Sequence, residues 1–458
     1  MRSLNHSKKF WTLFIVGSFL FLVSWFIFWE VKTRGLESLS GLVHILPAKV
    51  ETKTDFDTVL SLAESVLHTN GQEKAYLILF QNNMELRPGG GFIGSFGILK
   101  IRDGSITQFD VHDTGNFDGR IPDTIEPPYP MKETLRINSW KLRDSNYSPD
   151  FGENAMWAER FYQMGQGAEH FDGIIAVNAN LLNSFLRVTG PIQIPGYPGT
   201  YGAENAILDL EYQVEQGYLQ QDIAFGERKS VMEILGREIL GRARALPLSK
   251  KYELFRVILN DLHEKDIQLS FRDETLESEV IASGWDGAMD KNWKDDYLFI
   301  VDANLGAFKS DYYIERSYDY TVDLSGDVPK ARLLVTYDHT GKTKDWFSKD
   351  YQSFLRVYVP RGSYLSSVTN AKTEPVYGET QNKKYFGVLV QVPLSSRKTI
   401  SFDYTLPKNI DSSWYDLKME KQSGTKASAA KVTIIHKDGS KEEKNFSLDR
   451  NTIASEVE

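Results

Sequence analysis

An uncharged, strongly apolar stretch near the N-terminus places the firmest limit on how this chain can fold. Residues 10–29 read FWTLFIVGSFLFLVSWFIFW and contain no charged side chain. At ~1.5 Å of rise per residue, a helix of this length matches the ~30 Å hydrocarbon core of a bilayer. Trp11, Trp25 and Trp29 lie towards the ends of the stretch, where indole rings favour the headgroup layer. The pattern predicts one transmembrane helix.

The residues around this stretch predict its orientation. Arg2, Lys8 and Lys9 precede it, whereas acidic and basic residues are mixed in 30–37. Because cytoplasmic flanks are enriched in Lys and Arg, we expect residues 1–9 in the cytoplasm and nearly all of the chain outside it. The alternatives are a cleaved signal peptide and a buried core helix, but a signal peptide has a shorter apolar region that ends at small residues. We therefore expect a single-pass protein of the cell membrane that contacts the lipid bilayer through 10–29.

Length and composition limit the remaining possibilities. A chain of 458 residues exceeds the size of one ordinary domain, so two or three domains are expected. The net charge of -9 leaves no basic surface for a phosphate backbone, which argues against nucleic acid as a partner. The chain contains no cysteine, and this excludes disulfides, thiolate metal sites and cysteine nucleophiles.

After a linker at 30–53, the pattern predicts an α/β domain over 54–306, with a central mixed sheet flanked by helices. Short apolar runs alternate with helical periodicity, as in layered α/β folds. The Asp103-Gly104 pair separates two β-rich runs and predicts a hairpin. The expected strands include 75–80, 92–101, 105–111, 171–177 and 297–301, and the expected helices include 55–68, 154–164, 179–188, 203–216, 227–245 and 250–265.

The pattern changes from about residue 307 onwards. Runs of alternating aromatic and β-branched residues are separated by turn residues at short intervals. Such spacing favours an all-β, Ig-like sandwich over 307–450, followed by a short tail at 451–458.

The segment 82–97, NNMELRPGGGFIGSFG, is the most conspicuous candidate for a binding loop. It satisfies the letters of the dinucleotide fingerprint, but that fingerprint requires a helix where 92–101 reads as a strand. The amides of Gly89, Gly90 and Gly91 could still bind an anion, and Arg87 could add a two-pronged contact to a phosphate. The alternative is a tight turn beside a surface arginine.

Acidic residues gather in an irregular connection at 112–150. Asp113 and Asp150 are candidate ligands for Mg²⁺, which takes one or two carboxylates and lets substrate phosphate complete its shell. Aspartates in loops are also common turn formers, and that alternative stays open. Arg143 and Arg228 are further candidate cations. No Ser/His/Asp set, H-E-x-x-H motif or Walker loop supports other hydrolase chemistry.

Six segments together resemble the bacterial domain-of-unknown-function family 4012, over roughly 75–360. They are YLILFQNNMELRPGGGFIGSFG (76–97), NYSPDF (146–151), DGIIAVN (172–178), TGPI (189–192), GERK (226–229) and NLGAFKSDYYIERSYDY (304–320). That family carries no established activity.

The order of elements is also similar, more distantly, to the LytR-CpsA-Psr family of envelope phosphotransferases. The resemblance implies a polyprenyl-pyrophosphate-linked glycan as ligand, arginines on the pyrophosphate and aspartates on Mg²⁺. It matches Arg87, Asp113 and Arg228 to charged residues of that family's motifs, and Asn178 to the end of its strand before a helix. His112 and Phe225 stand where the family has arginines.

Two functional hypotheses follow. In the first, Arg87, Arg228 and Asp113 act on a lipid-linked glycan in an envelope phosphotransferase, with Gly89, Gly90, Gly91, Arg143 and Asn178 binding the ligand and Asp113 and Asp150 holding Mg²⁺. In the second, the chain is a non-catalytic adhesion or assembly protein of the envelope.

Overall fold

The computed structural model describes residues 50–67, 69–224, 227–410 and 414–457. The predicted transmembrane helix at 10–29, the N-terminal segment 1–9 and most of the linker 30–53 lie outside these residues. In the part of the chain that is described, no helix is both long and apolar enough to cross a bilayer.

The described residues fall into two compact units, and the smaller one comprises 50–74, 100–108 and 271–283. Its helices are α3 (Val50–Leu67), which contains the predicted helix at 55–68, and α11 (Glu274–Ala282). They are joined by a hydrogen bond of 2.8 Å between the hydroxyls of Thr58 and Ser283. The predicted Asp-Gly turn is confirmed, since Asp103 and Gly104 have φ of 44° and 72°, the left-handed values that a tight hairpin needs.

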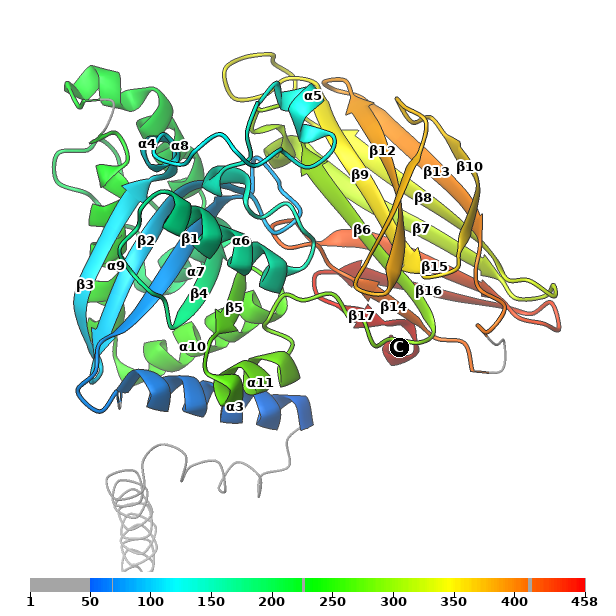
Figure 1. Cartoon of the computed structure of the whole chain (residues 1–458), viewed down its shortest axis with the longest axis horizontal. Coiled ribbons are helices and arrows are strands. Elements are labelled where there is room, and N and C mark those ends of the chain that lie inside the picture. Colours follow the sequence, from blue (N-terminus) through cyan, green and yellow to red (C-terminus); the bar gives the residue numbers. More distant parts are fainter. Residues whose placement is uncertain (1–49, 68, 225–226, 411–413, 458) are drawn as a thin grey trace, which may run out of the picture. The chain divides into compact units, whose positions relative to one another are not determined.

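The first sheet has five strands in the order β3-β2-β1-β4-β5 (Figure 1). Strand β1 pairs in parallel with β4, with Tyr76 opposite Gly173. The bounds are β1 Lys74–Asn82, β2 Phe92–Arg102, β3 Ser105–Asp113, β4 Gly173–Asn178 and β5 Ile267–Phe271. The strands predicted from 75–80, 92–101, 105–111 and 171–177 are therefore confirmed.

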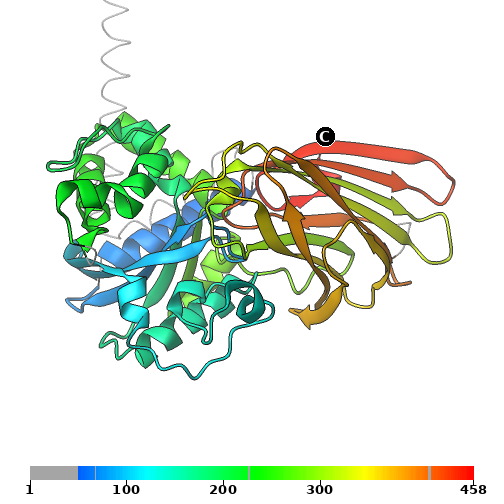
Figure 2. The ribbon, with the colours of Figure 1, turned by 90° about the horizontal axis from the view of Figure 1, so that it is seen from above.

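Helices cover both faces of this sheet. Figure 2 shows α6 with the connection 112–150 on one face and α8, α9 and α10 on the other. Helix α6 buries Phe151, Ala158 and Phe161, whose spacing forms one stripe on a helix. The helices of this region are α4 Thr114–Asp118, α5 Met131–Leu135, α6 Phe151–Met164, α7 Asn180–Thr189, α8 Ala206–Glu215, α9 Ser230–Ala245 and α10 Leu248–His263.

The C-terminal part of the larger unit is rich in strands, as predicted. Two six-stranded sheets have the orders β10-β13-β8-β7-β15-β16 and β11-β12-β9-β6-β14-β17. Side chains of both sheets, such as Val357 and Leu333, belong to one hydrophobic core. The bounds are β6 Asp296–Asn304, β7 Ile314–Asp323, β8 Lys330–His339, β9 Tyr351–Pro360, β10 Tyr364–Thr369, β11 Val376–Thr380, β12 Lys383–Val392, β13 Arg397–Thr405, β14 Leu417–Glu420, β15 Ser428–Ile435, β16 Lys441–Leu448 and β17 Thr452–Ile453.

Strand β6 pairs differently from the expectation. The sequence placed residues 297–301 in the α/β domain at 54–306, but β6 pairs antiparallel with β9 and parallel with β14. All nine of its residues are buried. A continuous apolar run predicts a covered strand without indicating which sheet covers it, and this explains the difference.

Candidate functional site

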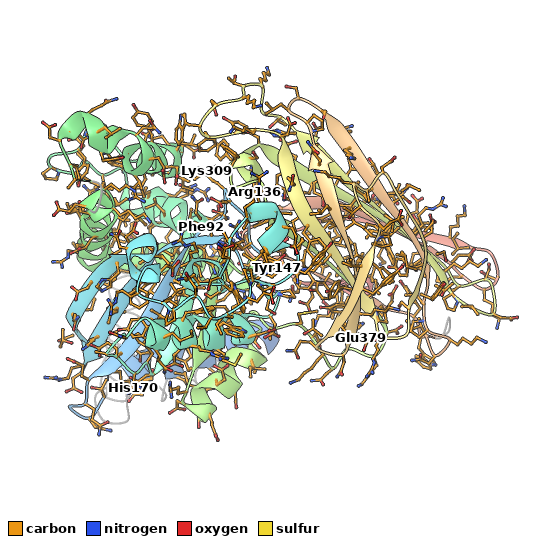
Figure 3. All side chains as sticks on the ribbon, turned by 45° about the horizontal axis from the view of Figure 1, so that its top comes forward. Phe92, Arg136, Tyr147, His170, Lys309 and Glu379 are labelled. Atoms are coloured by element: carbon orange, nitrogen blue, oxygen red, sulfur yellow. The ribbon has the colours of Figure 1, made fainter. Side chains whose placement is uncertain are left out.

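Arg87 lies in the connection between β1 and β2 and is only 2% exposed. Its Nε donates to Asp144 at 2.8 Å, its Nη2 to Glu85 at 3.0 Å and its Nη1 to the carbonyl of Asn304 at 2.7 Å. Phe92, labelled in Figure 3, places its ring centroid 5.5 Å from the guanidinium carbon. All three guanidinium nitrogens therefore have partners inside the protein, and the alternative of a surface arginine, which the sequence left open, is wrong.

The glycine-rich loop packs closely against the rest of the larger unit. The amide of Gly89 donates to the carbonyl of Asn146 at 3.0 Å, and that of Gly90 donates to the carbonyl of Arg87 at 3.0 Å. Gly90 has a φ of 129°, and a Cβ there would lie 2.0 Å from Oε1 of Gln81. Glycine is thus required by close approach as well as by backbone conformation. The Gly89 and Gly90 amides are used within the protein.

Asp113 and Arg228, two of the three predicted catalytic residues, lie together. Asp113 ends β3, caps α4 by accepting from the amide of Asn116 at 2.8 Å, and lies 2.7 Å from Nζ of Lys229 and 3.6 Å from Nη2 of Arg228. Lys229 also donates to the carbonyl of Gly94. Lys229 was not among the predicted residues, although its position directly after Arg228 in the GERK segment was a usable signal.

The charges of this cluster shift the pKa values of its members. Burial alone would raise the pKa of Asp113, but the hydrogen bond and attraction of Lys229, followed by the Asn116 amide and Arg228, lower it overall. Burial likewise lowers the pKa of Lys229, and Asp113 opposes that effect. We call Asp113, Arg228 and Lys229 the basic cluster, because two cations surround one carboxylate.

Asp150 has a separate set of partners. It caps α6 by accepting from the amide of Glu153 at 3.2 Å, and its second oxygen accepts from the amide of Met289 at 3.1 Å. Asp113 faces two cations instead. The two carboxylates thus have different partners, and a Mg²⁺ ion shared between them stays a prediction. Among the described residues, no group of three or more His, Cys, Asp or Glu side chains is arranged to hold a metal ion.

Arg143 and Asn178, which were also predicted to bind the ligand, have partners outside the basic cluster. Arg143 is 40% exposed in its side chain and pairs with Asp118 at 2.5 Å. Asn178 ends β4, is 3% exposed and donates from Nδ2 to Asp266 at 2.6 Å. Asp266 lines a pocket that the sequence analysis did not anticipate.

This pocket has a volume of about 640 Å³ and is lined by residues of α7 and α10 and of the segment after α10. Helices α7 and α10 pack against each other. We call this cavity the α7/α10 pocket. It is lined by Asn180, Asn183, Ser184, Arg187, Tyr252, Glu253, Arg256, Val257, Asn260, Asp261, Glu264 and Asp266. The available sequence signal was the run of polar residues at helical spacing within 180–187 and again within 252–264.

Two of the carboxylates that line the α7/α10 pocket, Asp261 and Asp266, are buried. Asp261 is 3% exposed and accepts from the hydroxyl of Ser184 at 2.9 Å. Burial raises the pKa of Asp261 to about 7, and neighbouring Asp266 adds to the increase. Burial also raises the pKa of Asp266, against the opposing effects of Lys421 and the hydrogen bonds from Asn178 and Asn180.

Comparisons with known proteins give limited matches. No curated protein sequence matches the chain. The solved structure of protein gbs0355 from Streptococcus agalactiae is 12% identical, covers 49% of this chain and 76% of its own, and has a TM-score of 0.29. That of Lin1025 from Listeria innocua is 11% identical, covers 47% of this chain and 79% of its own, and has a TM-score of 0.28.

The comparisons support one of the two resemblances drawn from the sequence. The similarity to the LytR-CpsA-Psr family stays a prediction. Residues 71–214, by contrast, match the model of the family described as "Protein of unknown function (DUF4012)", and over this part the chain is similar to domain-of-unknown-function family 4012.

Proposed function

We propose that this chain is a membrane-anchored, extracytoplasmic component of the cell envelope that binds an envelope polymer without transferring it. The observation that carries this proposal is the burial of Arg87, whose guanidinium is occupied by Asp144, Glu85 and the carbonyl of Asn304. A phosphotransferase needs cations that reach the phosphate where charge develops. Arg87 is not available for that task.

The anchor and the strand-rich region support the same proposal. The apolar stretch 10–29 is long enough to hold the chain at a bilayer. For 307–450 we infer an Ig-like sandwich, since two six-stranded sheets share one hydrophobic core. Such sandwiches present loops at their ends and are suited to binding.

A direct assay distinguishes binding from transfer. The full chain in detergent would be mixed with a polyprenyl-pyrophosphate-linked glycan and a cell-wall acceptor, with and without Mg²⁺, while binding to isolated envelope polymers is measured in parallel. We expect polymer binding and no transfer under either condition. Transfer that requires Mg²⁺ would contradict the proposal and restore the phosphotransferase hypothesis.

A second candidate function, binding of a phosphate-bearing ligand, is favoured by the basic cluster. Two cations lie within 2.7 and 3.6 Å of the single carboxylate of Asp113, so the cluster has a positive balance. Its ligand would be a lipid-linked glycan pyrophosphate, bound through Arg228 and Lys229.

Paired substitutions test this second candidate. Replacing Arg228 and Lys229 by Ala should lower binding of a pyrophosphate-linked glycan at least tenfold and leave binding of the dephosphorylated glycan unchanged. The control replaces two exposed cations of the strand-rich region, Arg332 and Arg397, which are 63% and 71% exposed in their side chains. Equal losses from both pairs would indicate an effect of overall charge and remove the candidate.

A further inference from the structure

The surfaces that α7 and α10 present to the α7/α10 pocket are unusually polar. Asn180, Asn183, Ser184 and Arg187 follow one face of α7, at the spacing of neighbours on a helix. Helices that pack together normally bury apolar stripes, because this burial is the main source of their stability. Within the lining, solvent surrounds the exposed side chains of Arg187, Tyr252, Glu253, Arg256 and Asn260. Ser184, Asp261 and Asp266 are buried, so these are the polar groups for which a bound ligand provides an explanation.

Two buried oxygens of the lining lack a hydrogen-bond donor. Oδ2 of Asp261 and Oδ1 of Asn183 are shielded from solvent, and neither accepts a hydrogen bond from any group that the structure describes. Leaving a buried acceptor without a partner costs roughly 1–3 kcal/mol. Both residues line the pocket, so a ligand entering it can supply the missing donors.

The remaining lining groups restrict the chemistry of that ligand. The lining has no excess of positive charge, since Glu253 and Glu264 offset Arg187 and Arg256, while burial raises the pKa of the remaining two carboxyl groups, Asp261 and Asp266. This balance disfavours an anion such as a phosphate. Val257 is the single aliphatic lining residue, so an apolar ligand would bury little matching surface.

An aromatic ring lies beside these polar groups. Tyr252 is 64% exposed and belongs to the same lining. An aromatic ring offers a flat apolar face next to its polar hydroxyl. A sugar ring has the complementary arrangement, with hydroxyls around its edge and C–H bonds on its faces. Amides both donate to and accept from such hydroxyls, whereas carboxylates accept from them and guanidiniums donate to them.

We propose that the α7/α10 pocket binds a saccharide unit of an uncharged envelope glycan, whose hydroxyls donate to Oδ2 of Asp261 and Oδ1 of Asn183. The proposal rests on the proposed function, because it identifies where the envelope polymer is bound. Arg187 and Arg256 donate to ring and hydroxyl oxygens, and Tyr252 covers one face of the sugar. Asn178, which the sequence analysis predicted to bind the ligand, instead holds Asp266 in position through its hydrogen bond.

The test uses the full chain in detergent and an array of bacterial surface saccharides, followed by calorimetry with the best soluble oligosaccharide. Asp261→Asn and Asn183→Ala should each lower affinity at least tenfold. Asp209→Asn on α8 makes the same chemical change as Asp261→Asn outside the pocket lining and should leave affinity within twofold. Thermal unfolding of each variant confirms that it is folded.

The outcomes separate this inference from the proposed function. If the wild type binds a glycan and the pocket variants bind it equally well, the pocket assignment is overturned and the binding function stands. If the wild type binds nothing on the array, the binding function fails together with the inference.

Discussion

At the scale of single residues, Arg87 illustrates how a side chain that looks functional can be structural. Its two carboxylate partners are themselves largely buried, with side-chain exposures of 12% for Glu85 and 6% for Asp144. Removing the cation from such a group leaves charges that neither water nor protein compensates. If Arg87 is structural, replacing it should therefore lower the free energy of unfolding measurably.

We expect Arg87→Ala to lower the free energy of unfolding by about 3–5 kcal/mol, the range found when one partner of a buried ion pair is removed. Urea denaturation at neutral pH measures this loss. The control is Arg361→Ala, because Arg361 pairs with Glu379, labelled in Figure 3, and the two side chains are 68% and 52% exposed. The control should change stability by less than ~1 kcal/mol. Similar small changes in both variants would contradict a structural role for Arg87.

Asp296 provides a second prediction at this scale, through pH. It is fully buried and accepts hydrogen bonds from the hydroxyls of Tyr320 at 2.5 Å and Tyr415 at 2.7 Å. Burial outweighs these bonds and raises the pKa of Asp296 from 3.8 to about 7. The folded state then binds more protons than the unfolded state between these values, so the free energy of unfolding falls as pH rises through this window.

Asp296→Asn should remove that contribution. Relative to the wild type, the variant should gain stability between pH 5 and pH 8, as measured by denaturation at both values. The matched change Asp323→Asn should show no such gain, because hydrogen bonds from Ser325 lower the pKa of Asp323 and move its titration below this range. A constant difference between Asp296→Asn and wild type would show that Asp296 is ionised at both pH values.

At the scale of elements, the glycine-rich loop and the segment after β14 depend on each other. Gly424 has a φ of 79°, and a Cβ there would lie 2.0 Å from the carbonyl oxygen of Gly90. Gly439 has a similar φ of 83°, but a Cβ there would meet nothing within 4 Å. The two positions share a backbone cost and differ in steric contact.

We expect Gly439→Ala to cost about 1–2 kcal/mol, the penalty for a left-handed alanine. Gly424→Ala should cost ~1–3 kcal/mol more, because backbone atoms must move apart. Thermal or urea unfolding of the two variants gives the difference directly. Equal losses would mean that the loop adjusts freely around position 424.

Local patterns predicted most elements but could not assign distant partners. The strand at 75–80, the turn at Asp103 and the helix at 55–68 follow from periodicity and turn chemistry over a few residues. Strand β6 joined an unexpected sheet because its fully buried run carries no information about its neighbours. The burial of Arg87 could not be foreseen either, since Asp144 and Asn304 lie far away in the sequence.

The candidate site shows the same division. Asp113 and Arg228 were selected by pattern and resemblance, and they lie 3.6 Å apart. The α7/α10 pocket was missed because polar residues on a helix usually indicate a solvated face. Only the packing of α7 against α10 reveals that these residues face a pocket.

At the scale of the whole molecule, the apolar stretch at 10–29 predicts where the chain resides. Removing residues 1–30 should move the protein from the membrane pellet to the soluble fraction, because the hydrophobic segment is lost. Protease added to intact cells should degrade the full chain while leaving a cytoplasmic marker protein intact. A full chain protected from protease, or one recovered as soluble protein, would contradict the predicted anchor and orientation.

The side-chain Nε2 of Gln422 donates both to the backbone carbonyl of Arg87 at 3.2 Å and to that of Asp302 at 2.7 Å. Gln422, which follows β14, therefore belongs to the same buried hydrogen-bond network as Arg87, which follows β1. Separately expressed halves, divided near residue 306, would each expose unsatisfied polar groups and should aggregate alone. Mixed during refolding, they should reassemble, so this protein is better suited to fragment complementation than to modular exchange.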